Sequence, residues 1–571
     1  MRRPFSFLLL AFLVLGIFYP SIFAESLSTD DHEMILGYSN MNGLDWQALF
    51  WPPSPPYYYR PLLGLSFYCD YFLFDSHAAI AHLENILLHL ASTLFLYAIL
   101  LRVVPAEKED LPLLAAIFFG VHPLAAEPVN WISGRTDLLA GFFVLLSFLF
   151  FLRNSEKKPG RDLLAAFGFL CGLWSKEVAI GLLPVILFAS LQEQDFAVQR
   201  KWRDIVRRVL PFFAVTLLYG LMRTGGHFTH DIGVMTAIHG GHGAENFPLS
   251  AKFLSLIKAI GFYSHKILWP FPLNFAIVEI NRPIALAVGI IALVSLAVAL
   301  LFCRRRPVML GLVWIPCFLA PALPVAVNRV AWTPLAERYL YLPLMGLCVV
   351  MAILMAGSPR KKIIALALAI LLCGFGTATV QRNIVWQKNI TLWQDVVEKS
   401  PHFAAGHNDY ALALLRAGNK QEAEKHFALA EGLAEGTGKN LAKSNIAMLQ
   451  GDIEQRFAML DTIQQSEQSP KLRCQVLYKM IRLINNELGD KEIASEKKRE
   501  WTRKLLVCQE QLAGLDKNPY HLYRIGQLHL ALGDKAAAQA AFAATCKDSN
   551  DYFTQPACTL AKRLAKETKG E

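Results

Sequence analysis

Residues 122–137 read His-Pro-Leu-Ala-Ala-Glu-Pro-Val-Asn-Trp-Ile-Ser-Gly-Arg-Thr-Asp, and they stand between two long apolar runs. The segment brings a histidine, two carboxylates and an arginine to the edge of sequence that has the composition of membrane helices. Ionisable side chains are costly in lipid, so this clustering indicates a buried polar site. The simpler alternative is a hairpin at the membrane edge in which Arg135 and Asp137 only pair with each other.

The composition is that of a polytopic membrane protein with a polar tail. Of the 571 residues, 54% are hydrophobic, and almost all of the long apolar runs lie before about residue 380. The basic residues, which give a net charge of +10, occur in short clusters between these runs. Such clusters are typical of cytoplasmic loops, so they indicate orientation in a membrane and not a nucleic-acid partner. We expect a membrane domain over 1–380 and a second domain over 381–571.

The basic clusters define an expected topology because each of them should face the cytoplasm. Eleven spans satisfy all clusters, with the amino terminus inside and the tail across the membrane. An apolar stretch at 253–269 is expected along the membrane surface, because a further span there would place the later basic clusters on the external side. The first span can also be interpreted as a cleaved signal peptide. The expected spans are 5–24, 81–102, 111–128, 137–152, 162–175, 178–192, 209–222, 284–303, 308–327, 339–356 and 363–380.

The tail contains helical repeats. Residues 407–430 and 522–542 share a pattern of Gly and Ala at the helix crossing with a later Phe, which is typical of tetratricopeptide (TPR) repeats. The stretch 440–515 is amphipathic but follows the pattern less closely. Stacked repeats form a curved surface that commonly receives an extended peptide, and the alternative is that they only scaffold the membrane domain. Disulfides and free thiols both remain open for the cysteines of the tail, Cys474, Cys508, Cys546 and Cys558.

Several polar motifs fall on the outer side in this topology. Asp30 and Asp31 follow the first span, and adjacent carboxylates above a membrane suit a general base or a metal ligand. His82, Asn85 and His89 form one stripe on the second span, which must face protein or water. Together with later motifs, these residues predict a polar cavity open to the exterior and to lipid. Its other expected members are Arg60, His122, Glu127, Arg135, Asp137, Lys176, Glu177, Arg338 and Tyr339.

The ordered motifs resemble those of the transmembrane and TPR repeat-containing O-mannosyltransferase family of GT-C glycosyltransferases. This resemblance implies an all-α fold, with a GT-C membrane domain followed by a TPR domain on the extracytoplasmic side, as in a bacterial inner membrane. It also implies sugar transfer from a polyprenyl phosphate to a protein or glycan acceptor. The motifs that carry it are Asp30-Asp31, Tyr59-Arg60-Pro61-Leu62, His82 and Asn85 ahead of His89, His122-Pro123 with Glu127, Ile132-Ser133-Gly134-Arg135 with Asp137, Ser175-Lys176-Glu177, and Ala336 through Pro343.

The resemblance assigns roles to some of these residues. It implies an acidic residue of the first external loop at the reaction centre, here Asp30 or Asp31. An acceptor hydroxyl needs a positioned carboxylate to take its proton, and cations must stabilise the charge that grows on the leaving phosphate. No cofactor is required by the motifs, and a divalent cation stays open. The expected phosphate ligands are Arg338, Lys176, Arg135 and Arg60.

Two other functions remain open. A membrane-anchored TPR scaffold would assemble envelope proteins without catalysis, and a transporter would pass a lipid-linked sugar through the same cavity. The conspicuous charges all lie on the outer side, which favours the transferase over a transporter with access from both sides. Two His-x-x-His pairs, at 227–230 and 239–242, have no family counterpart. A Gly-rich loop is expected there, with a metal site as the alternative.

Overall fold

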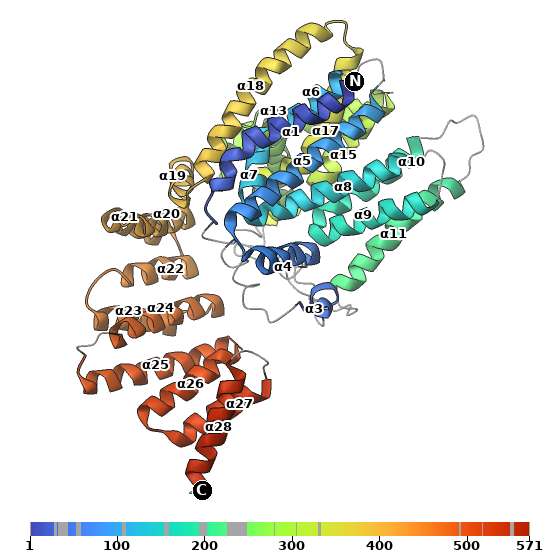
Figure 1. The fold of residues 1–571 in the computed structure, drawn as a ribbon. Helices are drawn as coiled ribbons and strands as arrows, with labels where there is room; N and C mark the ends of the chain where they lie inside the picture. Colours follow the sequence, from blue (N-terminus) through green and yellow to red (C-terminus); the bar gives the residue numbers. More distant parts are fainter. Residues whose placement is uncertain are drawn as a thin grey trace. The chain divides into compact units, whose positions relative to one another are not determined.

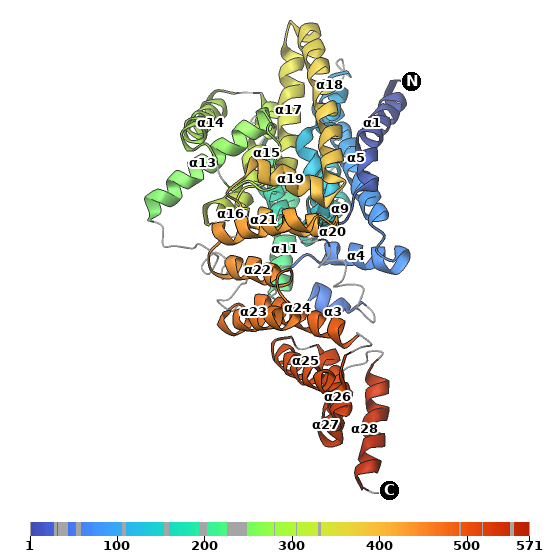
Figure 2. The same ribbon diagram turned by 90° about the vertical axis from the view of Figure 1, so that its left-hand side faces the viewer.

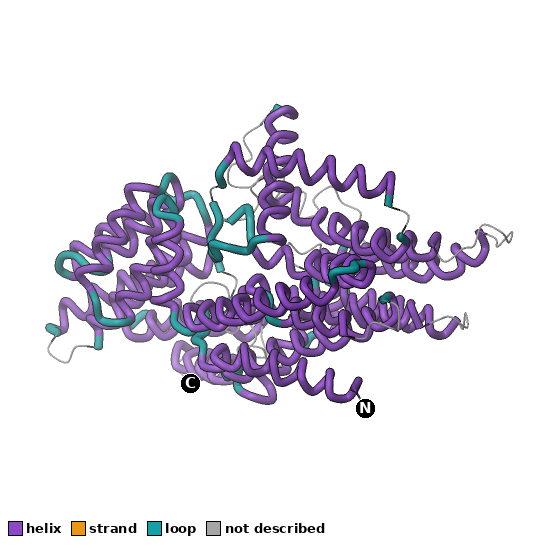
Figure 3. The backbone as a smooth tube through the Cα atoms, turned by 90° about the horizontal axis from the view of Figure 1, so that it is seen from above, coloured by secondary structure: helices purple, strands orange, loops and turns teal. Residues whose placement is uncertain are grey.

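The fold is helical in the computed structural model of the chain (Figure 1). Among the described residues the exception is one isolated antiparallel bridge, between Ile277 and Leu335, and Figure 3 shows helices joined by loops throughout. The predicted all-α class is therefore confirmed. The structure describes residues 2–27, 31, 44–52, 59–104, 110–153, 159–192, 202–224, 248–278, 280–303, 305–328, 333–489, 493–516, 518–548 and 553–569.

The described chain divides into two compact units, Met1–Ser400 and Pro401–Glu571. In the first unit the α-helices are interrupted by short 3-10 helices, labelled η. Its elements are α1 (Arg2–Phe18), η1 (Tyr19–Phe23), α3 (Trp46–Phe50), α4 (Pro61–Phe74), α5 (Ala78–Val103), α6 (Asp110–Gly120), η3 (Pro123–Ala125), α7 (Ala126–Asn130), η4 (Ile132–Gly134), α8 (Arg135–Arg153), α9 (Pro159–Ser175), η5 (Glu177–Gly181), α10 (Leu182–Gln192), α11 (Trp202–Arg223), α13 (Leu249–Leu268), α14 (Arg282–Phe302), α15 (Arg306–Leu319), η6 (Ala320–Ala322), α16 (Leu323–Asn328), η7 (Glu337–Leu340), α17 (Tyr341–Gly357), α18 (Lys361–Trp386) and α19 (Asn389–Lys399).

The division between the units lies after Ser400, whereas the sequence analysis placed it after residue 380. The last membrane helix does not end at 380, because α18 continues without a break to Trp386. The next helix, α19, is tied to the start of the chain, since the backbone N–H and the side-chain amide of Asn389 both donate to Glu25 at 3.1 Å. The connector therefore belongs to the first unit.

Eight described helices are long and apolar enough to cross a membrane, so the chain is an integral membrane protein. A ninth span is added if the bent pair Asp110–Gly120 and Pro123–Asn130, which meet at 47°, crosses as one. All eleven expected ranges coincide with helices, but the number eleven is not confirmed. The expected number of spans exceeds the number of candidate spans because α9, with 17 residues, and α10, with 11, are short for a bilayer core of about 30 Å.

The bend between α6 and α7 shapes the segment 122–137. The helix α6 ends at Gly120, and Pro123 opens the turn η3, since proline lacks a backbone N–H and does not continue a helix from within. The Leu124 backbone N–H donates to Nδ1 of His122 at 3.2 Å and caps this turn. Every residue from 121 to 138 is buried. The segment thus lies inside the helical bundle, as expected for a buried polar site.

The helices α13 and α14 lie side by side (Figure 2), and two glycines permit their close approach. A Cβ atom on Gly261 would lie 1.8 Å from the carbonyl oxygen of Ala285, and one on Gly289 would lie 2.1 Å from that of Ile257. The stretch 253–269, now part of α13, is not among the candidate spans. Its expected position along the membrane surface stays a prediction.

The second unit is a series of helices in which each packs against the next. Gly418 and Gly533 have φ of +84° and +90° at turns between paired helices, a conformation that glycine adopts without strain. Ala538 and Phe542 are fully buried, so the predicted repeats are confirmed, and 440–515 is also built of helices. The elements are α20 (Ala404–Arg416), α21 (Lys420–Leu433), α22 (Gly436–Ala447), α23 (Ile453–Ser466), α24 (Pro470–Leu488), α25 (Ser495–Leu515), α26 (Pro519–Leu532), α27 (Lys535–Asp548) and α28 (Thr554–Lys569).

The cysteines of the second unit are in two states. Cys546 on α27 and Cys558 on α28 form a disulfide. Cys474 and Cys508 are free thiols. The sequence had left both states open because spacing alone does not determine which cysteines meet.

Candidate active site

Asp31 connects the loop after the first span to the segment 122–137. Its Oδ1 accepts hydrogen bonds from the backbone N–H of Ser133 at 2.8 Å and from the Ser133 hydroxyl at 2.6 Å. Its Oδ2 accepts from the backbone N–H of Leu27 at 2.9 Å, and the residue is 1% exposed. Asp31 therefore joins the end of the first span to the segment 122–137. Asp30, the other expected catalytic residue, lies outside the described residues.

Tyr339 is the common neighbour of two expected phosphate ligands. The Lys176 ammonium lies 5.3 Å from the centroid of its ring, and the Arg338 guanidinium carbon lies 5.0 Å from it. Lys176 donates to both carboxylate oxygens of Asp137 at 2.7 Å. Arg338 donates to Glu127 from its backbone N–H, at 3.0 Å, and from Nη1. Each cation is thus paired with a buried carboxylate of the segment 122–137.

Glu177, which directly follows Lys176 in the chain, contacts two further arginines. Its Oε2 accepts from Nε and Nη2 of Arg60 at 3.3 and 3.1 Å. Its Oε1 accepts from Nη1 of Arg223 at 3.0 Å, and the same Nη1 donates to the Tyr219 hydroxyl at 2.9 Å. One carboxylate therefore bridges two guanidinium groups. The sequence analysis expected Arg60 and Glu177 in the site but not Arg223 or Tyr219.

The sequence does contain a signal for Arg223. Basic residues favour cytoplasmic loops, yet Arg223 ends a span whose carboxyl-terminal end is external in the expected topology. A lone arginine that departs from this rule is a candidate for a specific partner. The structure supplies two partners, Glu177 and Tyr219, which lie on η5 and on the preceding turn of α11.

Arg135 does not join the other expected phosphate ligands. Its Nη1 forms ion pairs with Asp70 at 2.8 Å and with Glu84 at 3.0 Å, and its Nε donates to Asn85 at 3.1 Å. Its side chain is 1% exposed. The simple hairpin interpretation is wrong, because Arg135 does not pair with Asp137. The contacts of Arg135 instead hold α8 against α4 and α5, and the sequence analysis missed both of its carboxylate partners.

The polar stripe of α5 faces protein, as expected. His82, Asn85 and His89 are all completely buried. The Asn85 amide donates to the carbonyl of Trp131 at 3.0 Å. Nδ1 of His89 lies 3.0 Å from the Tyr341 hydroxyl, and its Nε2 lies 3.1 Å from the carbonyl at the end of α6. The stripe supports the backbone around the bend in α6 and does not line an open cavity.

Metal-ligand residues are not gathered in the part of the chain that the structure describes. No group of three or more His, Cys, Asp or Glu side chains there is arranged to hold a metal ion. Both His-x-x-His pairs, at 227–230 and 239–242, lie outside the described residues.

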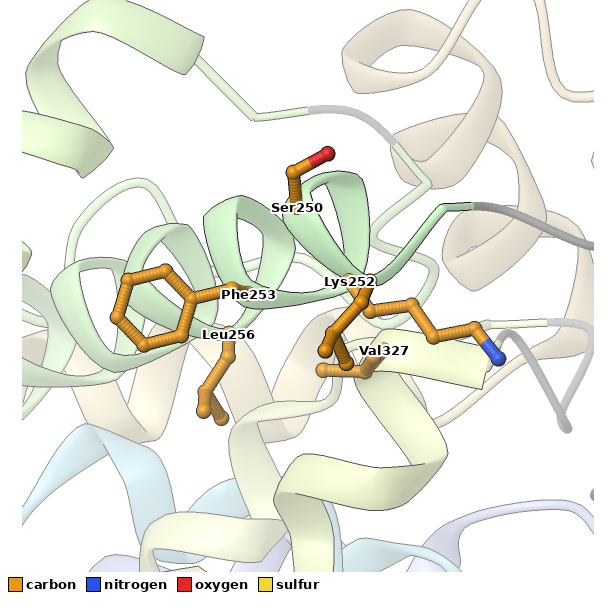
Figure 4. Close-up of a pocket in the computed structure, with 6 residues that line it drawn as sticks. Ser250, Lys252, Phe253, Leu256 and Val327 are labelled. Atoms are coloured by element: carbon orange, nitrogen blue, oxygen red, sulfur yellow. The ribbon is translucent and has the colours of Figure 1, made fainter.

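Two apolar surface grooves do not involve the charged residues described above. One has a volume of about 550 Å³ between α13 and α16, where Phe253, Leu256 and Val327 form the walls and Lys252 lies beside them (Figure 4). The other has about 570 Å³ and is lined by α1, α6 and α18. Neither lining includes an expected catalytic or phosphate-binding residue.

Comparison with known proteins identifies sequence relatives. The chain is 28% identical over 424 residues to protein O-mannosyl-transferase TMTC1 of Homo sapiens. This alignment covers 65% of this chain and 47% of the relative. It is 24% identical over 445 residues to protein O-mannosyl-transferase F38B6.6 of Caenorhabditis elegans, covering 72% and 60%. It is 27% identical over 435 residues to protein O-mannosyl-transferase TMTC4 of Homo sapiens, covering 65% and 57%. The match thus spans about half to three fifths of these relatives.

Other comparisons add little. No protein-family model matches the chain. A chain in the crystal structure of the APC/C hetero-tetramer Cut9-Hcn1 aligns with 83% of this chain and 99% of its own length. Its identity of 14% and TM-score of 0.18 are too low to support an argument. By sequence, the chain is a relative of the protein O-mannosyl-transferases, as the ordered motifs predicted.

Proposed function

We propose that this chain is a membrane glycosyltransferase that moves a sugar from a polyprenyl phosphate to a hydroxyl group of a protein or glycan. The observation that carries the proposal is the cluster in which Lys176 and Arg338 share Tyr339 as a neighbour while Arg60 contacts Glu177. Charged groups at membrane depth are costly and mark functional sites. The names of the sequence relatives make mannose the first sugar to test and a protein the first acceptor.

The cations retain N–H groups that a phosphate can use. Arg338 donates to Glu127 from its backbone N–H and Nη1, while its Nε and Nη2 have no acceptor among the described residues. The Lys176 ammonium uses two of its three hydrogens on Asp137. The carboxylates orient these side chains, and the remaining donors suit phosphate oxygens. In the transition state, where negative charge grows on the leaving phosphate, such preset donors lower the barrier.

The two aspartates of the first external loop have different roles in this proposal. We assign the proton of the acceptor hydroxyl to Asp30, because Asp31 is buried against Ser133 and Leu27. Asp31 is assigned to the support of the site through its contacts with Ser133 and Leu27. A hydroxyl of high pKa loses its proton as the glycosidic bond forms, so a carboxylate within hydrogen-bond reach accelerates transfer. Arg135, which is committed to Asp70 and Glu84, is assigned to the support of the site.

The proposal includes an orientation. The reaction and the helical repeats lie on the extracytoplasmic side of the inner membrane, and the amino terminus lies in the cytoplasm. The disulfide between Cys546 and Cys558 supports this orientation, since disulfides persist in oxidising compartments. Stacked helical repeats commonly bind extended peptides, and here they would bind the acceptor.

The test is transfer by the purified full chain. The assay supplies a radiolabelled mannosyl polyprenyl phosphate and a panel of envelope proteins, and it measures label in protein and release of polyprenyl phosphate. Transfer that is lost in Lys176→Met and retained in Lys252→Met supports the proposal, since Lys252 lies at the apolar groove outside the cluster. Equal transfer by the parent chain and Lys176→Met would overturn the assigned site. Absence of transfer with mannosyl, glucosyl and N-acetylglucosaminyl donors alike would overturn the activity.

A further inference from the structure

Glu177 occupies the space between two arginines in a way that resembles a bound anion. Its two carboxylate oxygens are divided between Arg60 and Arg223, at 3.1 and 3.0 Å. The Glu177 side chain is 33% exposed, whereas those of Arg60 and Arg223 are 16% and 12% exposed. Glu177 is therefore the most exposed of the three side chains. An anionic group that took the place of the Glu177 carboxylate would contact the same two arginines.

The Nη2 group of Arg223 is a donor that Glu177 does not satisfy. Its Nη1 is shared between Glu177 and Tyr219, while its Nη2 is buried and has no acceptor among the described residues. A buried N–H group without an acceptor is unfavourable, and nearly all such groups in folded proteins have a partner. The carboxylate oxygens of Glu177 accept from Arg60 and from Nη1 of Arg223, and neither accepts from Nη2. The unused donor indicates a ligand that places an acceptor oxygen beside Nη2.

A phosphate has the required chemistry. A polyprenyl phosphate sugar has two free phosphate oxygens, and the polyprenyl phosphate released by transfer has three and a second negative charge. Guanidinium groups bind phosphate through paired, charge-assisted hydrogen bonds. Arg60 is one of the expected phosphate ligands, and Glu177 directly follows another, Lys176, in the chain. The place that Glu177 fills is therefore part of the seat proposed for the donor phosphate.

We propose that Glu177 is an internal stand-in for the donor phosphate and that Arg223 is a further phosphate ligand. This inference rests on the proposed function. When the lipid phosphate binds, its oxygens replace the Glu177 carboxylate on Arg223 and Arg60, and the buried Nη2 of Arg223 gains an acceptor. Glu177 keeps the arginines oriented when no donor is bound. The contacts exchanged are ion pairs and hydrogen bonds, so no covalent step is involved.

The exchange makes opposite predictions for the two partners. Glu177→Gln keeps the shape of the side chain and removes the competing charge, so binding of a polyprenyl phosphate should tighten severalfold. Arg223→Gln should weaken it by about ten- to a hundredfold, the effect of losing a charge-assisted contact. Arg223→Lys, which keeps the charge but not the paired donors, should fall between. The control is Arg207→Gln, an exposed arginine on the same helix near its other end.

The measurement is binding of a short-chain polyprenyl phosphate to the full chain in detergent, beside the uncharged polyprenol. The changes should appear with the phosphate and not with the alcohol. Weaker phosphate binding in Glu177→Gln would make Glu177 a structural anchor and overturn the inference, as would unchanged binding in both Arg223 variants. If Arg223→Gln does not fold, Arg223→Lys and Glu177→Gln still decide the question. Because binding is measured without turnover, a chain that binds phosphate but transfers no sugar would refute the activity alone.

Discussion

The Lys176 ammonium lies 2.7 Å from both carboxylate oxygens of Asp137, with 11% and 4% of the two side chains exposed. Breaking a buried ion pair by removing one partner typically costs about 3–5 kcal/mol, because the remaining charge is left uncompensated. Asp137→Asn should therefore destabilise the membrane unit and abolish transfer. The same loss of stability is expected from Lys176→Met, and thermal unfolding of the purified chain measures both.

The double variant separates stability from function. Asp137→Asn with Lys176→Met removes both charges, so stability should return most of the way to that of the parent chain. Transfer should not return, because the proposed phosphate ligand is missing. Recovery of transfer in the double variant would show that the pair has only a structural role. A control pair is Lys535→Met with Glu567→Gln, an exposed contact whose loss should change stability by less than about 1 kcal/mol.

Helices and polar motifs could be predicted because both depend on local sequence. Apolar runs placed all eleven expected spans on helices, and the spacing of His82, Asn85 and His89 predicted a stripe that faces protein. The number of spans could not be derived in this way. Whether short helices such as α9 and α10 cross a bilayer depends on their packing and not on composition.

Partners between helices were the part that the sequence did not reveal. Arg135 was expected among the phosphate ligands, but packing of α4 and α5 against α8 brings Asp70 and Glu84 to it. A single carboxylate in an apolar helix carries no mark of the residue that it will contact. Arg223 did carry a signal, because a basic residue at the external end of a span departs from the preference of basic residues for cytoplasmic loops. Contacts between distant segments follow from tertiary packing, which a single sequence does not specify.

The crossing of α13 and α14 predicts sharp sensitivity to one methyl group. Gly261→Ala would bring its Cβ to 1.8 Å from the Ala285 carbonyl oxygen, which is backbone and does not move aside easily. The helices must separate, and overpacking of this kind typically costs about 1–3 kcal/mol. Gly220→Ala and Gly374→Ala are matched controls in α11 and α18, because a Cβ there meets no atom within 4 Å. The unfolding temperature of Gly261→Ala should be well below those of both controls. Equal unfolding temperatures of all three variants would contradict the observed crossing.

The half-buried side chain of Lys479 gives the second unit a pH dependence. Its Nζ donates to the Ser444 hydroxyl at 2.6 Å, and no carboxylate among the described residues pairs with it. Burial lowers the pKa of Lys479 from 10.5 to about 8. Between pH 8 and 10.5 the unfolded chain therefore holds a proton that the folded chain has released. Stability should rise with pH through this window and should be lower below pH 8, where the half-buried charge is present.

A comparison of variants isolates this contribution. The difference in unfolding temperature between Lys479→Met and the parent chain should move in favour of the parent as pH increases from 7 to 10. Lys471→Met, on the exposed face of the same helix, should show no such trend. A constant difference between Lys479→Met and the parent across this range would mean that the ammonium stays charged in the folded chain.

The disulfide offers a test of orientation in cells. If the second unit lies on the oxidising side, Cys546 and Cys558 should resist a thiol-reactive maleimide until the protein is reduced. Cys474, a partly exposed free thiol, should react without reduction and serves as the internal control. Mass spectrometry of the labelled tryptic peptides distinguishes the three positions. Full labelling of Cys546 and Cys558 in unreduced cells would place the unit on the reducing side and contradict the proposed topology.

The reaction centre predicts different results for two neighbouring aspartates. Asp30→Asn should lower the rate of transfer by about 10² to 10⁴, the typical contribution of a general base, without changing donor binding or stability. Asp31→Asn should lower the unfolding temperature as well, because an amide group replaces an oxygen that accepts from Ser133 or Leu27.

Arg338→Ala should weaken donor binding and transfer together, since it removes donors from the proposed phosphate seat.

Three measurements on each purified variant decide among these roles: transfer rate at saturating donor, affinity for the polyprenyl phosphate, and unfolding temperature. Loss of rate alone in Asp30→Asn, with loss of both rate and stability in Asp31→Asn, would assign the base to Asp30 and the positioning role to Asp31. Full turnover by Asp30→Asn would remove this residue from catalysis.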